Sequence, residues 1–419
     1  MLISGLTTLR PDRDSGQHRG ITSVCSAHPE VLTAALAAGA RRGTSVLVEA
    51  TCNQVNQEGG YTGQTPADFR REVLRLAQAS GLPAARLILG GDHLGPNPWR
   101  SLPADQAMQR ARDMIAAYAA AGFTKLHLDC SMGCAGEPLA LDDATAAARA
   151  ADLAAVAEAQ APEPPVYVIG TEVPVPGGAL EEVEGLEVTP PAAARETLEI
   201  HRAAFADKSL HRAFERVIGL VVQPGVEFGN HNVVGYIPEA ARDLSASLAD
   251  MPGIVFEAHS TDYQTDAALA ALVHDGFAIL KVGPWLTFAL REALYGLDAI
   301  EAELSGGARR LRATMERLML AAPENWEKYY PGAPQEQAIM RHFSLSDRIR
   351  YYWNQPEAKS EVAALLLRLG SRDLPMPLIG QHLGSAEDDV LQGLVAPKAA
   401  PLLRASVTRV LDRYARACG

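Results

Sequence analysis

Short apolar runs alternate with helix-like segments along the first two-thirds of the chain. Each run is rich in β-branched residues and ends in polar ones. Continuous apolar runs are typical of parallel strands buried on both faces, and segments 102–122 and 143–160 between them show the 3.6-residue apolar period of helices. Eight such runs, alternating with helices, predict an α/β fold, a TIM (β/α)8 barrel. The runs are 21–27, 45–51, 86–92, 124–130, 166–172, 219–225, 254–260 and 278–284.

An open, doubly wound sheet is the structural alternative. That fold often carries a G-x-G-x-x-G fingerprint at its first turn, and none follows the first run here. The strand pattern stops near Ser305, and the remainder has helical patterns with aromatic clusters. We therefore predict a barrel over residues 1–305 and a helical C-terminal extension over residues 306–419.

Composition and charge exclude several classes of protein. A hydrophobic fraction of 47% is far above that of a disordered chain. The net charge of −12 argues against nucleic acid or an anionic membrane as the partner. The sequence shows neither a secretory signal nor an apolar run of about 18 residues. It contains five cysteines at irregular spacing. These features predict a soluble, cytoplasmic protein, and they leave the oligomeric state open, a homo-oligomer included.

Polar side chains stand at the predicted strand ends, where TIM barrels carry their active sites. Imidazoles with a carboxylate and an open coordination position are typical of a catalytic metal site. A glycine-rich turn with a capping histidine is the plainer interpretation of the Asp92-His93 pair, but histidines and a carboxylate at other strand ends favour the metal. The candidate ligands are His93, Glu172, His231 and His259.

Some of these assignments have alternatives. His231 lies several residues beyond its strand, so Gln223 or Glu257 is an alternative ligand. His127 lies deeper in its strand than Asp129, and we interpret it as a core histidine. Asp92 is the predicted general base, and Asp129 would assist or orient it.

Further residues suit a sugar or sugar phosphate. The loop after residue 51 is rich in amides, which both donate to and accept from hydroxyl groups. Lys281 at the last strand end suits an electrostatic role better than a Schiff base. Arg348, with Arg350 nearby, lies at a predicted helix start that would suit a phosphate. The candidate substrate-binding residues are Asn53, Gln54, Asn56, Ser260, Asp262, Lys281 and Arg348.

The longest motifs together resemble one family over nearly the whole chain. The segments VEATCNQVNQEGGYTGQTPADFR, GGDHLGPN, KLHLDCSM, YVIGTEVPVPGG, VVQPGVEFGNHNVV, FEAHSTDYQT and SLSDRIRYYW are similar to those of the GatZ/KbaZ family. The resemblance implies a barrel like that of the zinc-dependent class II aldolases. It also implies that Asp92 matches a catalytic aspartate and His93 the first metal ligand, with Glu172, His231 and His259 at comparable strand ends.

The same resemblance implies more than one function. Family members are described as non-catalytic subunits of tagatose-1,6-bisphosphate aldolase, in older descriptions as tagatose-6-phosphate kinases, and in part as ketohexose 4-epimerases. Carbon 4 of a 2-ketohexose is not acidified by a neighbouring carbonyl. Its inversion therefore needs either transient oxidation or cleavage and re-formation of the C3–C4 bond, and the missing dinucleotide fingerprint favours cleavage.

We therefore predict an isomerase of carbohydrate catabolism from galactitol or tagatose that interconverts D-tagatose 6-phosphate and D-fructose 6-phosphate. It would need a divalent metal ion, Zn²⁺ as first choice with Mn²⁺ or Mg²⁺ as alternatives, and no nucleotide cofactor. The substrate would be a ketohexose or its phosphate. The rival hypotheses are a non-catalytic subunit that stabilises a partner aldolase, and an aldolase that releases triose products.

Overall fold

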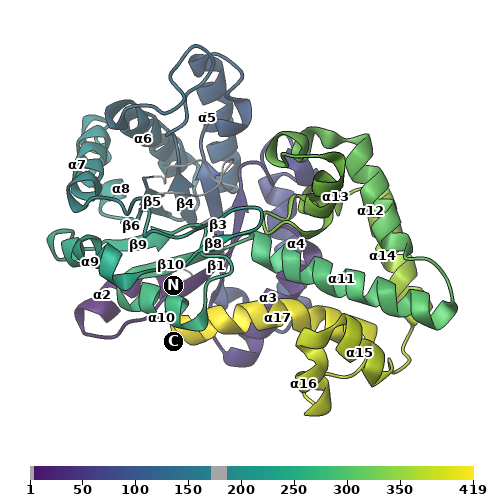
Figure 1. Cartoon of the computed structure of the whole chain (residues 1–419). Coiled ribbons are helices and arrows are strands. Elements are labelled where there is room, and N and C mark those ends of the chain that lie inside the picture. Colours follow the sequence, from purple (N-terminus) through teal and green to yellow (C-terminus); the bar gives the residue numbers. More distant parts are fainter. Residues whose placement is uncertain (1–3, 171–185) are drawn as a thin grey trace.

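The centre of the protein is a closed barrel of eight parallel strands (Figure 1). The structure is a computed structural model that describes residues 4–170 and 186–419. Around the barrel the order is β1, β10, β9, β6, β5, β4, β3, β2. The predicted TIM barrel with C-terminal helices is confirmed. The barrel strands are β1 (Ile21–Val24), β2 (Val46–Thr51), β3 (Leu87–Leu94), β4 (Lys125–Leu128), β5 (Val166–Ile169), β6 (Val217–Val221), β9 (Val255–Ala258) and β10 (Phe277–Val282).

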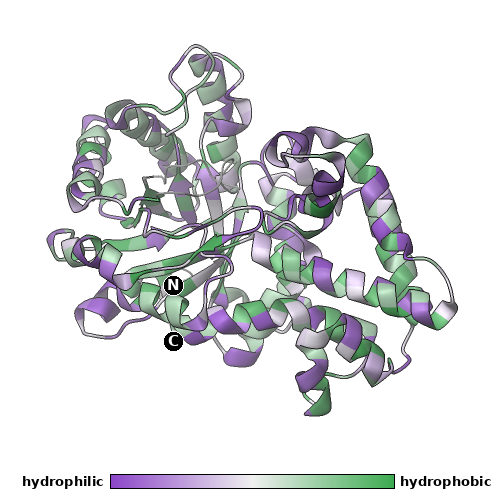
Figure 2. Cartoon of the chain, in the orientation of Figure 1, coloured by the Kyte–Doolittle hydropathy of each residue, from purple (hydrophilic) through white to green (hydrophobic). Residues whose placement is uncertain are grey.

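The strands are buried because helices cover their outer side. Every residue of β3 and of β10 is buried, as their continuous apolar sequences require. Figure 2 shows hydrophobic residues along the central strands and a mixture of both kinds on the surrounding helices. The helices up to the last strand are α1 (Ser4–Thr7), α2 (Leu9–Asp14), α3 (Pro29–Arg42), α4 (Pro66–Ala79), α5 (Ala104–Ala120), α6 (Asp143–Gln160), α7 (Pro191–Asp207), α8 (His211–Phe214), α9 (Pro238–Ala246) and α10 (Asp266–His274).

A small hairpin interrupts the alternation between β6 and β9. Its strands, β7 (Glu227–Phe228) and β8 (Val233–Val234), pair antiparallel outside the barrel. The hairpin places its turn beyond the carboxyl end of β6, and the side chain of His231 in that turn is exposed.

Helices alone follow the last strand in the described chain. α11 (Pro284–Ser305) ends where the predicted barrel segment ends, and α17 (Ala399–Cys418) returns to pack on α3, α10 and α11 (Figure 1). The other helices of the extension are α12 (Arg310–Ala321), α13 (Pro334–Phe343), α14 (Pro356–Leu369), α15 (Met376–His382) and α16 (Glu387–Leu391). Among the described helices, none is both long and apolar enough to cross a bilayer.

Candidate functional site

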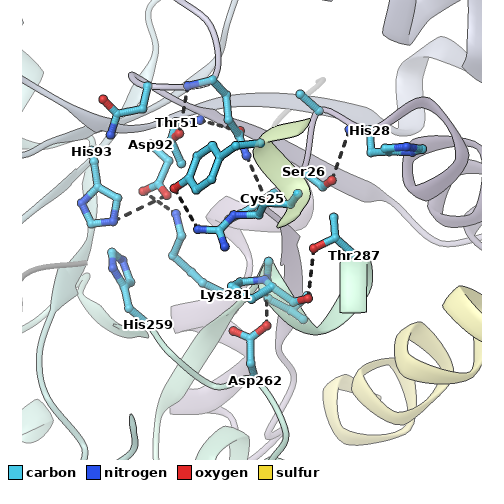
Figure 3. Close-up of a pocket in the computed structure, with 18 of the residues that line it drawn as sticks. Cys25, Ser26, His28, Thr51, Asp92, His93, His259, Asp262, Lys281 and Thr287 are labelled. Atoms are coloured by element: carbon cyan, nitrogen blue, oxygen red, sulfur yellow. Dashed lines mark hydrogen bonds and ion pairs between the residues drawn. The ribbon is translucent and has the colours of Figure 1, made fainter. Parts of the chain in front are cut away.

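A cavity opens at the carboxyl ends of the strands (Figure 3). Its wall comes from the ends of β1, β2, β3, β9 and β10, from hairpin strand β7 and from residues 350–354 of the extension. Eight of the predicted site residues line it: Asn53, Gln54, Asp92, His93, His259, Ser260, Asp262 and Lys281.

Three histidines and one aspartate meet at one side of this cavity. Asp92 and His93 lie at the end of β3, His127 lies on β4, and His259 directly follows β9. One ligand-type atom from each of the four lies within 4.8 Å of those of the others. The four side chains, which we call the histidine cluster, are at most 8% exposed. Several donor atoms of these side chains lie close enough together to bind one buried cation.

Unusual backbone angles at the strand ends set the direction of the side chains around the cluster. His93 and Ser260 have φ angles of 48° and 52°, in the left-handed region that non-glycine residues seldom occupy. Such a conformation costs about 1 kcal/mol or more and persists where surrounding contacts hold it. At His93 the backbone N–H donates to His127 Nδ1 over 3.2 Å. The strained turn at the end of β3 therefore couples two members of the cluster.

Each histidine of the cluster is oriented by a partner. His93 Nδ1 lies 2.8 Å from Asp129 Oδ2, and His259 Nε2 lies 3.0 Å from Glu257 Oε1. His127 donates from Nε2 to the carbonyl of Gly170 over 3.0 Å. A carboxylate or carbonyl behind each ligating imidazole is the usual arrangement around protein-bound metals, where it sets the ring's tautomer. His93 and His259, each with a carboxylate behind its ring, therefore fit a divalent cation, whereas both ring nitrogens of His127 bond within the protein.

A layer of paired charges, which we call the ionic floor, lies inside the barrel next to the cluster. Lys125 Nζ contacts Glu49 Oε1 at 2.5 Å and Glu257 Oε2 at 2.7 Å. Lys281 Nζ contacts Glu49 Oε2 at 2.9 Å and reaches Asp92 Oδ1 at 2.5 Å. Glu49, Lys125 and Glu257 are fully buried. Lys281 thus connects the floor to the histidine cluster.

The buried charges shift one another's pKa. Burial by itself raises the pKa of Asp92, but the nearby His93 and Lys281 outweigh it and hold that pKa well below its usual value. Burial lowers the pKa of Lys281, and the neighbouring carboxylates reverse this, so that its pKa is raised. Asp92 is therefore an ionised carboxylate and Lys281 an ammonium, which does not suit a Schiff base.

Asp262 behaves differently from Asp92. Burial raises the pKa of Asp262 to about 6, although it accepts hydrogen bonds from the backbone N–H groups of Gly283 and Trp285. Those bonds cap the start of α11. Figure 3 shows Asp262 on the Lys281 side of the cavity, away from His93.

Several predicted residues lie elsewhere. Asp129 contacts His93 rather than the cavity, and Asn56 binds the backbone of its own loop through the Cys52 carbonyl and the Glu58 N–H. The exposed His231 does not meet the cluster, because the hairpin carries it outward. Glu172 lies outside the described residues.

Two further candidates, Gln223 as an alternative ligand and Arg348 for the phosphate, do not line the cavity. Gln223, an alternative ligand, accepts hydrogen bonds from the N–H groups of Gly225 and Val226 through Oε1, so it stabilises a turn. Arg348 does not line the cavity, since its guanidinium stacks over Tyr329 at 3.3 Å and donates to the Asn325 carbonyl.

His127 is fully buried and both of its ring nitrogens are bonded, as expected of a core histidine, and the structure also brings it into the histidine cluster. For the phosphate, the sequence favours Arg348 over its neighbour Arg350. Arg350, Tyr351 and Asn354 line the cavity from the extension. Their approach to the strand ends depends on long-range packing that no local pattern reveals.

The chain is similar to known proteins along nearly its whole length. A family model described as D-tagatose-1,6-bisphosphate aldolase subunit GatZ/KbaZ-like matches residues 6–419. The chain is 55% identical over 420 residues to the D-tagatose 6-phosphate 4-epimerase of Agrobacterium fabrum, covering 99% of this chain and 98% of the relative. A crystal structure of a probable tagatose 6 phosphate kinase from Sinorhizobium meliloti superposes with a TM-score of 0.90 at 57% identity, covering 96% of this chain and 100% of that one.

Proposed function

Because the chain belongs to the GatZ/KbaZ-like family, we propose that it is a metal-dependent epimerase that inverts carbon 4 of D-tagatose 6-phosphate to give D-fructose 6-phosphate. The observation that carries the proposal is the histidine cluster beside the ionised Asp92 at the strand ends. The relative from Agrobacterium fabrum, similar over its whole length, bears the name of this activity.

His93 and His259 are the ligands that we propose for the ion. Their rings stand edge to face, 4.8 Å apart between centroids, and each has a carboxylate behind it. Glu172, two residues beyond Gly170, is the proposed carboxylate ligand from outside the described residues. His231 would have to leave its exposed position to join them. A divalent ion held there would polarise the C2 carbonyl of the sugar and offset the negative charge that develops on it.

Asp92 is the proposed general base. As an ionised carboxylate within the cavity it can take the proton of the C4 hydroxyl. The C4 oxygen then forms a carbonyl as the C3–C4 bond breaks, and the bond's electron pair passes to C3 and onto the C2 oxygen. The released aldehyde turns its other face, the C3–C4 bond forms again, and Asp92 returns the proton. No atom is gained or lost, and no oxidant is needed.

The wall of the cavity supplies the contacts that keep both fragments in place. Gln54 is fixed by its hydrogen bonds with the Thr51 N–H and the Cys25 carbonyl, which hold the amide loop against the strand ends. Asn53 lines the same wall. Amides can bind sugar hydroxyls as donors and as acceptors. An epimerase must keep the cleaved aldehyde in the cavity until the C3–C4 bond forms again, whereas an aldolase releases it.

Incubation of the purified full chain with D-tagatose 6-phosphate tests the proposal. We expect D-fructose 6-phosphate, its loss on treatment with a chelator, and its return when Zn²⁺, Mn²⁺ or Mg²⁺ is added. Substrate deuterated at C4 should react at nearly the undeuterated rate and keep its label, because the C4–H bond does not break in this route. The proposal is falsified if no divalent ion supports product formation, and a large deuterium effect would instead indicate oxidation at C4.

The family description favours one alternative, a subunit that stabilises a separate aldolase. Such a role predicts a stable complex with a second, catalytic barrel and no epimerisation by the isolated chain. Size-exclusion chromatography of the chain, alone and mixed with an aldolase of this kind, separates the two proposals when it is combined with the activity measurement.

A further inference from the structure

One segment of the C-terminal extension lies at the mouth of the barrel. We call residues 344–354 the return segment. It contains a short 3-10 helix, Arg348–Tyr352, and three of its side chains, those of Arg350, Tyr351 and Asn354, line the cavity. The cavity is therefore built jointly by the strand ends and by a part of the chain that lies beyond the barrel.

Buried contacts fix the return segment to the barrel. Asp347 has a φ of 46°, and its carboxylate accepts hydrogen bonds from Thr287 Oγ1 at 2.7 Å and from Arg291 Nε at 2.9 Å. The side chain of Asp347 is fully buried and that of Arg291 nearly so. Tyr263 donates its hydroxyl hydrogen to the Leu345 carbonyl over 2.6 Å. A strained backbone held by such contacts presents its neighbours rigidly.

Arg350 stands out among the cations of the cavity wall. Within the described chain its guanidinium forms no ion pair. Nη1 donates to the carbonyls of Ser346 and Asp347, and Nη2 donates to the Tyr351 hydroxyl over 3.0 Å. Lys281, the other cationic side chain of the described wall, contacts Asp92 and Glu49. Neutral acceptors orient Arg350 without cancelling its charge.

A second arginine, Arg348, lies close to Arg350 at the ring of Tyr351. Burial raises the pKa of Tyr351, but Arg350 and Arg348 outweigh burial and lower that pKa. The guanidinium carbons of these arginines lie 4.5 Å and 5.2 Å from the centre of the Tyr351 ring. Asp262 on the same wall is engaged by backbone N–H groups and forms no ion pair with Arg350. Two cations around one phenol favour an anionic ligand.

From this arrangement we infer that Arg350 binds the phosphate group of the sugar and so positions the opposite end of the carbon chain at the histidine cluster. A guanidinium fork pairs with phosphate oxygens through two parallel N–H···O bonds. The Asn354 amide can add a further donor from the same segment. The inference rests on the proposed function for the identity of the sugar, but the anion site itself does not depend on turnover.

Titration calorimetry with inorganic phosphate as the ligand tests the anion site directly. We expect Arg350→Met to bind phosphate at least about tenfold more weakly than the unaltered chain, since it removes the charge-assisted hydrogen bonds to the anion. Arg350→Lys should recover part of the affinity. The matched control is Arg317→Met, which removes an exposed arginine of α12 that pairs with Glu357 outside the cavity and should bind phosphate like the unaltered chain.

Kinetics give the second measurement. We expect Arg350→Met to lower kcat/KM for D-tagatose 6-phosphate by about 100-fold, and to lower it far less for unphosphorylated D-tagatose, so that the preference for the phosphate ester collapses. Equal phosphate affinity in the Arg350→Met and unaltered chains overturns the inference, as does an unaltered chain that binds no phosphate. Phosphate binding through Arg350 without epimerisation would instead overturn the proposed function and leave the anion site standing.

Discussion

The barrel holds two neighbouring groups of charged side chains, and they are balanced differently. In the ionic floor, the carboxylates of Glu49 and Glu257 face the ammonium groups of Lys125 and Lys281. In the histidine cluster, Asp92 and the adjoining Asp129 contact imidazoles. Among the described residues, Lys281 is the only lysine that contacts either aspartate, and it contacts Asp92. The floor is complete without a ligand, whereas the cluster has an excess of negative charge and electron-pair donors. Neighbouring charges in one barrel are thus balanced in the ionic floor, whereas those of the histidine cluster are left suited to a cation.

Replacing the carboxylate that lies between the two groups should have the largest effect. We expect Asp92→Asn to lower kcat for epimerisation by about 10³-fold, because the amide cannot take up a proton. The shape is conserved, so the circular dichroism spectrum should change little, whereas the unfolding midpoint should fall because the amide loses the ionic contact with Lys281. Activity within tenfold of the unaltered chain would remove Asp92 from the role of base.

Breaking the floor should act on stability. Lys125→Met leaves Glu49 and Glu257 without one of their two cations, and we expect the free energy of unfolding to fall by about 3 to 5 kcal/mol, as measured by urea denaturation. A second change, Glu49→Gln, should restore part of this loss by removing one unpaired charge. If Lys125→Met is as stable as the unaltered chain, the ion pairs of the ionic floor do not stabilise the folded protein.

Measuring the affinity for Zn²⁺ tests whether the ion is bound by His93 of the histidine cluster or by His231 of the hairpin. We expect His93→Ala to lower the affinity for Zn²⁺ by about 100-fold, as measured with a competing chelator, because it removes a donor and its Asp129 partner loses its role. The comparison variant is His231→Ala, whose side chain is exposed in the hairpin turn. An affinity for Zn²⁺ close to that of the unaltered chain would keep His231 out of the site, and a loss as large as that of His93→Ala would show that the hairpin folds inward on the ion.

The smallest effect concerns a titrating group at the rim of the cavity. Burial lowers the pKa of His28 to about 4, and its Nδ1 accepts the Glu30 N–H at the start of α3. Between pH 6.5 and 4 the unfolded chain therefore binds more protons at this residue than the folded chain does, and acidification costs stability. We expect the loss in unfolding free energy between pH 7 and pH 5 to be about 2 kcal/mol smaller in His28→Asn, which keeps a capping acceptor that does not titrate. An equal loss in both chains would contradict the assignment.

Local patterns predicted most of the barrel because each strand is buried on both faces and each therefore has a continuous apolar run. They also predicted the strand-end residues Asp92, His93, His259 and Lys281, since parallel strands bring their carboxyl ends to one place. The depth of His127 in β4 predicted a core histidine, and it is fully buried, but no local pattern shows that the strained turn at His93 lies directly against it. A helix start in the sequence pointed to Arg348, but the packing of the return segment turns Arg350 toward the cavity instead.

The last helix has a consequence for how the protein is made. In α17, Tyr414 donates its hydroxyl hydrogen to the Thr261 carbonyl over 2.7 Å, and Thr261 Oγ1 donates to the Lys281 carbonyl over 2.6 Å. The loop that follows His259 is thus held by residues translated more than a hundred positions later, and Arg350 also arrives after every strand has been synthesised. Because chains fold progressively as they leave the ribosome, a barrel that has closed during synthesis still lacks a finished pocket. The wall of the cavity is therefore complete only when α17 has been synthesised and has docked on α3, α10 and α11.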